Sequence, residues 1–333
     1  MTCLNKKSKV IISIVLTILI PVVFFQSCSK DGLANIDNTI QLLPELSDYD
    51  IFQGIPSNLN PSPDFHFYEL STCLFTDYAE KQRLIKIPAG TKMSAIHNGL
   101  LEFPDGTVIA KTFFYYNDKR DTSKGKKIIE TRVLIKSGST WSAGTYLWND
   151  AQTDGKLATT GVNKSIGWID AAGNPNIISY HVPSKNECNT CHQANNTLIP
   201  IGLKVRNLNR DVARLNSTVN QLQYFYSSGL INPIDPANFT ALPNWQNQSF
   251  SIEQRTRAYL DVNCAHCHNK QGFAADTNLF FGYEIPLEES GIKREKEAII
   301  DRFEQGIMPK LGTTVVDKEA LALLKSYIIF LKA

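Results

Sequence analysis

Two copies of one five-residue pattern constrain this chain more than any other feature of its sequence. CNTCH occupies residues 188–192 and CAHCH occupies residues 264–268. Together they contain four of the seven cysteines and three of the six histidines in a chain of 333 residues. A Cys-x-x-Cys-His sequence is typical of covalent haem attachment in c-type haem proteins. The repeat therefore predicts two haem c groups.

The spacing inside each copy has a geometric reason. Cysteines three positions apart on a helical turn lie on one side of it, so both can form thioethers with the haem vinyl groups. The histidine that follows can then reach the iron. The predicted sets are Cys188, Cys191 and His192 for the first haem, and Cys264, Cys267 and His268 for the second.

Two other interpretations of the four cysteines remain open. Two Cys-x-x-Cys pairs have a spacing that suits one structural zinc site with four thiolate ligands. In an oxidising compartment the same pairs could instead form disulfides. Neither alternative explains why a histidine follows the second cysteine of both pairs.

The N-terminus predicts export. Three lysines within residues 6–9 precede an uncharged, mostly apolar run over residues 10–25, which is short for a membrane span and is broken by Pro21. Ser27 is a small residue directly before Cys28, as in a bacterial lipoprotein signal. We expect residues 1–27 to be removed and Cys28 to be acylated, which would anchor the protein to a membrane on the periplasmic side or at the cell surface. An uncleaved anchor and an ordinary secreted protein are the alternatives.

The mature chain then divides by composition. Residues 28–67 are rich in Pro, Asn, Asp and Ser, which predicts a tether. Residues 68–183 contain strand-length runs rich in β-branched and aromatic residues, such as GTVIAKTFFYY, and predict a β-sandwich-like module. Trp141, Trp148 and Trp168 fit its core better than a sugar-binding platform.

The C-terminal copy has a helical context. Ser251 and Gln254 form a capping-box pattern at the start of a helix that leads into CAHCH, and Asp317 is a cap candidate for the last helix. Between the two helices, Pro309 makes Met308 a loop or helix-end residue. This order resembles a class I cytochrome c domain over residues 249–333. The resemblance implies that Met308 is the sixth ligand, opposite His268.

The first copy, in a segment over residues 184–248, has no such methionine. His181 is a candidate sixth ligand opposite His192, with His97 and His66 as others. An open position is the alternative, and an open iron would make the protein an enzyme. Arg210 is a candidate donor to a haem propionate.

The whole mature chain resembles a family of exported bacterial cytochrome-c-like haem proteins with two such motifs. Members are found alone or attached to quinoprotein-type sugar dehydrogenase modules. The resemblance implies haem binding and electron transfer, with a redox donor and acceptor as partners. It rests on the order of several stretches: ELSTCLFTDYAEKQRLIKIPAG, FPDGTVIAKTFFY, IETRVLIKSGSTWSAGTYLWNDAQTD, YHVPSKNECNTCH, GLKVRNLNRD, RAYLDVNCAHCH and IMPKLGTTVVD.

The sequence thus predicts an α+β multidomain protein, with an N-terminal β-sandwich-like module followed by a mostly α-helical cytochrome c-like haem region. The net charge of +2 and the lack of long basic runs argue against nucleic acid as a partner. We expect a membrane-anchored dihaem electron carrier between a periplasmic dehydrogenase and a downstream acceptor. The alternatives are a peroxidase-like enzyme with an open first haem, and a haem-free lipoprotein whose β module binds a ligand.

Overall fold

The computed structural model describes residues 40–194, 197–214 and 216–332. The expected signal at 1–27, the acylation candidate Cys28 and the first part of the expected tether lie outside these residues. Within the described ranges, no helix has the length and apolar character that a membrane crossing requires.

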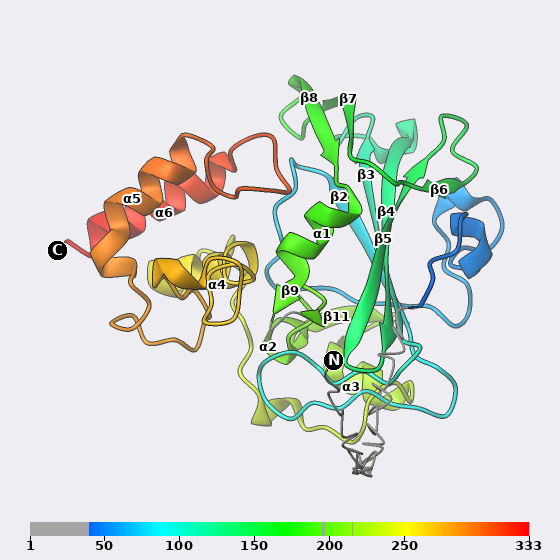
Figure 1. The fold of residues 1–333 in the computed structure, drawn as a ribbon, viewed down its shortest axis with the longest axis horizontal. Helices are drawn as coiled ribbons and strands as arrows, with labels where there is room; N and C mark the ends of the chain where they lie inside the picture. Colours follow the sequence, from blue (N-terminus) through cyan, green and yellow to red (C-terminus); the bar gives the residue numbers. More distant parts are fainter. Residues whose placement is uncertain (1–39, 195–196, 215, 333) are drawn as a thin grey trace, which may run out of the picture. The chain divides into compact units, whose positions relative to one another are not determined.

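A six-stranded antiparallel sheet forms the N-terminal half of the described chain, with its strands in sequence order (Figure 1). The runs rich in Val, Ile, Phe and Tyr form its long central strands, as β propensity predicts. The strands are β1 His66–Phe67, β2 Glu80–Lys86, β3 Val108–Tyr116, β4 Lys126–Ser137, β5 Thr140–Trp148 and β6 Gly155–Leu157.

The mixed α+β class is confirmed, but the expected sandwich is replaced by one sheet and a separate hairpin. Strands β7 Val162–Ile169 and β8 Pro175–Val182 pair with each other as a two-stranded sheet. Their apolar side chains, including Trp168 and Tyr180, pack with Phe113 of β3. A two-stranded hairpin has too little apolar surface to form a second full layer, and here it covers only part of one sheet face.

The expected tether over 28–67 is wrong for its described C-terminal part. Leu46, Ile51, Leu59 and Phe65 are buried in a core cluster against the other face of the sheet, with Leu84 among their neighbours. The prolines and polar residues of this segment form turns between these apolar anchors. Composition alone reflects the turns and misses four side chains that hold the segment to the sheet.

A second core cluster covers the remaining part of the first face. It joins residues of the sheet, including Trp141, to residues 203–231 that follow the first motif. Trp141, Trp148 and Trp168 are all buried, as predicted for core residues. The elements of this segment are α2 Val205–Leu208, β11 Asp211–Arg214, β12 Ser217–Asn220 and α3 Gln221–Ser227.

The first motif forms the helix α1, Lys185–His192, on the sheet. Ser184 and Glu187 form a capping box at its start. Figure 1 shows α1 beside β5, and the Cys188 Sγ lies 3.8 Å from the Thr145 Oγ1 of that strand. Two short strands, β9 Gln193–Ala194 and β10 Thr197–Leu198, follow the helix and pair with each other.

Three helices form the C-terminal core cluster, and the sequence predicted the first and the last of them but not the middle one. They are α4 Ile252–Asn263, α5 Ile292–Glu304 and α6 Lys318–Phe330. The predicted capping box is confirmed, since the Ser251 and Gln254 side chains bond reciprocally at the start of α4. The predicted cap at Asp317 is confirmed as well, because its carboxylate accepts the Ala320 N–H at the start of α6.

Candidate functional site

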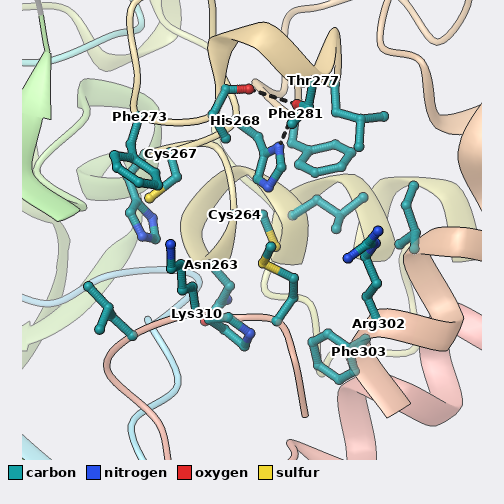
Figure 2. Close-up of a pocket in the computed structure, with 18 of the residues that line it drawn as sticks. Asn263, Cys264, Cys267, His268, Phe273, Thr277, Phe281, Arg302, Phe303 and Lys310 are labelled. Carbon is teal, nitrogen blue, oxygen red and sulfur yellow. Dashed lines mark hydrogen bonds between the residues drawn. The ribbon is translucent and has the colours of Figure 1, made fainter. Parts of the chain in front are cut away.

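A cavity of about 470 Å³ lies among the C-terminal helices, and CAHCH forms one of its walls. Leu260, Leu279, Phe281, Phe303 and Leu324 supply much of its apolar lining. Figure 2 shows Cys264, Cys267 and His268 on this wall, with Phe303 and Arg302 from α5 on another. The cavity therefore places the second motif beside an apolar space instead of bulk water.

Backbone hydrogen bonds continue α4 into the second motif. The Cys264 N–H donates to the Leu260 carbonyl at 2.9 Å, and the His268 N–H donates to the Cys264 carbonyl at 2.9 Å. The motif thus follows the helix directly as a helical turn. Cys264 and Cys267 both line the cavity, as the predicted thioether geometry requires.

The hydrogen bonds around His268 define its tautomer. The Thr277 hydroxyl donates its hydrogen to the Ala274 carbonyl at 2.7 Å, so its oxygen accepts from the His268 Nδ1 at 3.3 Å (Figure 2). His268 therefore carries its proton on Nδ1 and keeps the lone pair on Nε2. Burial lowers the pKa of His268, which favours the neutral imidazole. A neutral imidazole whose other nitrogen is hydrogen-bonded is the arrangement that metal-ligating histidines show.

Met308 lines the same cavity as His268, as its predicted ligand role requires. Its N–H donates to the Arg302 carbonyl at the end of α5, at 3.1 Å, so the loop starts from a fixed point. The loop is also held at its far end, where Thr314 donates to the Asp77 carboxylate from both its N–H and its hydroxyl, at 2.8 and 2.9 Å. A methionine fixed in this way supplies a soft thioether donor to the cavity.

The histidine of the first motif has the same electronic arrangement. The His192 Nδ1 lies 2.8 Å from the Ile199 carbonyl, which can only accept, so this nitrogen is the donor and Nε2 keeps its lone pair. Burial lowers the pKa of His192 to about 3, with the nearby cation of Lys111 adding to the effect. His192 is therefore neutral and available as a ligand.

The two motifs meet in the fold, although 75 residues separate their histidines along the chain and nothing in the sequence predicted the contact. Cys191 and Cys267 lie close enough to shift each other's pKa, which is raised for Cys191 and lowered for Cys267. Cys191 and Thr190 of α1 also line the cavity of the second motif. The first motif thus forms part of the second motif's wall.

His266 lies at this contact, and sequence reasoning missed it as a functional candidate. It bonds to Cys191 and carries a buried Nδ1 without a hydrogen-bond partner among the described residues. The missing information was tertiary, because only the fold brings the first motif to this side of the second.

The thiols of the described cysteines form no disulfides. None of the five described cysteines is in a disulfide. The described part of the chain also contains no group of three or more His, Cys, Asp or Glu side chains placed to hold a metal ion. Cys188 faces Thr145 while Cys191 faces Cys267, so the four motif thiols do not converge on one point.

Two predicted site residues are engaged elsewhere. The His181 Nδ1 lies 2.7 Å from Asn163 Oδ1 and its Nε2 lies 2.9 Å from Glu187 Oε1. Arg210 donates to the Leu70 carbonyl at 2.7 Å. Both nitrogens of His181 and the guanidinium of Arg210 therefore already have protein partners, and one partner of His181, Glu187, lies on the helix α1 of the first motif.

Two basic side chains complete the cavity of the second motif. Arg302 and Lys310 line it, and the Lys310 Nζ also lies 5.1 Å from the ring centroid of Phe273. Figure 2 shows both side chains at the cavity. The lining also includes Glu295, but it is mostly apolar, and two cationic donors at such a pocket suit a largely hydrophobic ligand that carries carboxylates.

The chain was compared with protein families, curated proteins and solved structures. No protein-family model matches the chain, and no significant match is found among curated proteins or among solved structures. The residues themselves fit a haem c group: two thiols, a neutral imidazole with a free Nε2, a thioether, apolar walls and two cations.

Proposed function

We propose that this protein is a c-type cytochrome with two haem groups that carries electrons. The observation that carries the proposal is the cavity of about 470 Å³, whose lining includes Cys264, Cys267, His268 and Met308. Bound there, the haem supplies one-electron redox chemistry. His268 and Met308 would both hold the iron, and two protein ligands suit electron transfer better than catalysis.

The chain's own residues set the conditions for that chemistry. Thr277 holds His268 in the tautomer with a free Nε2, and the apolar walls around Leu279 and Phe281 exclude water. Arg302 and Lys310 balance carboxylate charge. A neutral thioether from Met308 favours the ferrous state and raises the potential relative to a second histidine.

The contact between the motifs supports transfer within the molecule. Cys191 and Cys267 line one cavity, so the residues that would hold the two haems come together at this point of the fold. His192 and His268 would hold the two irons. We propose that electrons pass between the two haems across this contact.

A peroxidase-like enzyme is the second candidate, and one observation favours it. His181, the predicted sixth ligand of the first site, is already bonded at both nitrogens. A first haem without a protein ligand opposite His192 would bind small molecules. Carbon monoxide binding by the reduced protein separates the two functions: a carrier with both positions filled binds it slowly, and an enzyme with an open iron binds it at once.

Anchoring and partners belong to the proposal too. The lipoprotein-like N-terminus and the resemblance to exported cytochrome-c-like proteins favour a membrane-anchored protein that faces the periplasm or the cell surface. Its donor would be a periplasmic dehydrogenase, for instance of the quinoprotein type, and its acceptor a downstream redox protein. The proposed function involves haem c and redox partners, and no nucleic acid partner is expected.

An anaerobic redox titration followed by visible absorption tests the function. A carrier takes up two electrons per chain, one per haem, and returns both to a one-electron acceptor such as ferricyanide. The Cys264→Ala/Cys267→Ala variant should take up one. An uptake of no electrons in the haem bands of the parent protein contradicts the proposal.

A further inference from the structure

A row of positive charges crosses the sheet below the first motif. In the strand register, Arg83 of β2 lies opposite Lys111 of β3, Lys111 lies opposite Arg132 of β4, and Arg132 lies opposite Thr145 of β5. Directly paired residues on adjacent strands share one face of a sheet. Three cations thus stand side by side on the face that carries α1.

A fourth cation joins the row through a shared aromatic ring. The charged groups of Lys81, Lys111 and Arg132 lie over the ring of Phe113, at 6.0, 5.0 and 4.4 Å from its centroid. Like charges directly opposite each other on a sheet are destabilising, and cation–π contacts offset only part of that cost. The fold therefore holds a cluster of basic side chains close together.

The protein supplies little counter-charge. Glu130 is buried against Arg132, which it accepts from at 2.6 and 3.1 Å, and it also accepts the Tyr180 hydroxyl. Within the described residues, no ion pair involves Lys81, Arg83 or Lys111. Arg83 is 8% exposed, and its Nε is buried without a hydrogen-bond partner.

The titration of these groups agrees with missing counter-charge. Burial, together with the neighbouring Arg83, lowers the pKa of Lys81 to about 7 and holds that of Lys111 well below its ordinary value. Buried cations shift in this direction when no anion stabilises the charged form. An anionic ligand at this face would restore both groups to the charged state.

The row faces the predicted first haem. Cys188 contacts Thr145, which pairs with Arg132 at the β5 end of the row. The vinyl groups and the propionates of a haem lie on opposite edges of the macrocycle. Neighbouring strands are about 4.8 Å apart, so Lys111 and Arg83 stand roughly 10 and 14 Å across the sheet from Thr145.

We propose that Arg83, Lys111 and Arg132, with Lys81 beside them, bind the propionate groups of the haem that Cys188 and Cys191 hold. Cys188 would hold the haem at the β5 end of the row. The cations nearer β2 would bind its carboxylates. This role replaces the one predicted for Arg210. The inference rests on the proposed function, because it assigns the ligands of a haem that the function requires.

The same cations would also bind a free oxyanion such as phosphate. One set of protein variants distinguishes binding of the haem propionates from binding of a free oxyanion. The set comprises the full chain matured with haem, the variants Arg83→Gln and Lys111→Gln, and the charge-retaining variants Arg83→Lys and Lys111→Arg. Lys127→Gln is the matched control, because Lys127 is an exposed lysine on β4 of the same sheet. A Cys188→Ala/Cys191→Ala protein lacks the thioethers of the first haem.

Resonance Raman spectra of the propionate bending modes and redox titration are the main measurements. Arg83→Gln and Lys111→Gln should shift a propionate mode and lower the potential of the first haem, while Lys127→Gln leaves both unchanged and the charge-retaining variants restore them in part. Inorganic phosphate at constant ionic strength should raise the melting temperature of the Cys188→Ala/Cys191→Ala protein, and Lys111→Gln in that background should abolish the rise.

Three results would overturn the proposal. Propionate modes that are identical in the parent protein, Arg83→Gln and Lys111→Gln mean that the cations do not touch the carboxylates. Stabilisation of the two-haem parent by phosphate means that the site binds a free oxyanion instead. A pyridine haemochrome count without a haem at Cys188 and Cys191 means that the proposed function itself has failed, which the other two results do not imply.

Discussion

At the scale of single residues, the two motif histidines His192 and His268 are held in the same tautomer. His192 donates from Nδ1 to a backbone carbonyl and His268 donates from Nδ1 to a hydroxyl, so each presents Nε2 as an acceptor. The choice of tautomer is made by Ile199 and Thr277, neither of which belongs to a motif. Partners of this kind are what make an imidazole a well-oriented and basic metal ligand.

Removing the partner of His268 should change the second haem's potential. In Thr277→Val the Nδ1–H loses its acceptor, the imidazole becomes a weaker donor, and the ferric state is less stabilised. We expect a higher potential for this haem with two haems still attached, measured by redox titration. Thr277→Ser keeps the hydroxyl and should match the parent protein; a potential that is equal in all three proteins would show that Thr277 has no such role.

Removing Met308 should change the same haem in the opposite direction. Met308→Ala removes the thioether, so the red-end charge-transfer band of the ferric protein should disappear and the potential should fall. Met93→Leu is the matched control, because Met93 is fully buried in the sheet-side core. A variant at position 308 that keeps both the band and the potential would remove Met308 from the ligand set.

At the scale of elements, a buried carboxylate holds the Met308 loop against the segment before β2. Asp77 is 1% exposed and accepts hydrogen bonds from three donors, the Thr314 N–H and hydroxyl and the Val315 N–H. Burial raises its pKa, although these donors oppose the shift. Asp77 also has a positive φ of 50°, which Asp and Asn adopt more readily than other non-glycine residues.

Asp77→Ala should loosen this loop. The lost hydrogen bonds and the unfavourable φ for alanine should reduce the free energy of unfolding by about 2–3 kcal/mol, measured by chemical denaturation. Asp77→Asn keeps one acceptor oxygen and the tolerated φ, so its loss should be smaller. Asp64→Ala is the control at an exposed carboxylate. A loss at Asp77 no larger than at Asp64 would mean that the carboxylate does not secure the loop.

The elements also show what the sequence could and could not predict. Local signals were sufficient for the capping box at Ser251, the cap at Asp317 and the strands of the sheet. They failed where the deciding contacts are long-range. The segment around Leu46 and Ile51 has the composition of a tether, and only the sheet face that it covers makes it part of the core. The contact between Cys191 and Cys267 could not be predicted either, because no residue near either cysteine in the sequence points to it.

At the scale of the whole described chain, ion pairs connect the two motif segments. Asp261 of α4 accepts from Lys204 at 2.8 Å and from Arg206 at 2.6 Å, both in the segment that follows the first motif. Arg206 also pairs with Glu284. Asp261 is 2% exposed, and a buried carboxylate that loses its partners is costly. These pairs hold α4, and with it the second motif, beside α2.

These ion pairs should make stability fall in acid. Burial alone would raise the pKa of Asp261, but Lys204 and Arg206 outweigh it and lower the pKa below the ordinary value of 3.8. The unfolded state therefore binds a proton first, so the stabilisation is complete above about pH 4 and is lost as the pH falls through the folded pKa. The parent protein and Asp261→Asn should differ most in melting temperature near pH 7 and converge as the pH falls through the folded pKa of Asp261. A difference independent of pH would exclude this linkage.

The central claim is that each of two motifs holds a haem, and a pyridine haemochrome assay with site variants tests it most directly. The assay uses full-length protein from a host that matures haem c, with Cys188→Ala and Cys264→Ala beside it and Cys73→Ala as the control cysteine. We predict two haems per chain in the parent protein and in Cys73→Ala, with one attachment site lost in each motif variant. No covalently bound haem in the parent protein would contradict the account.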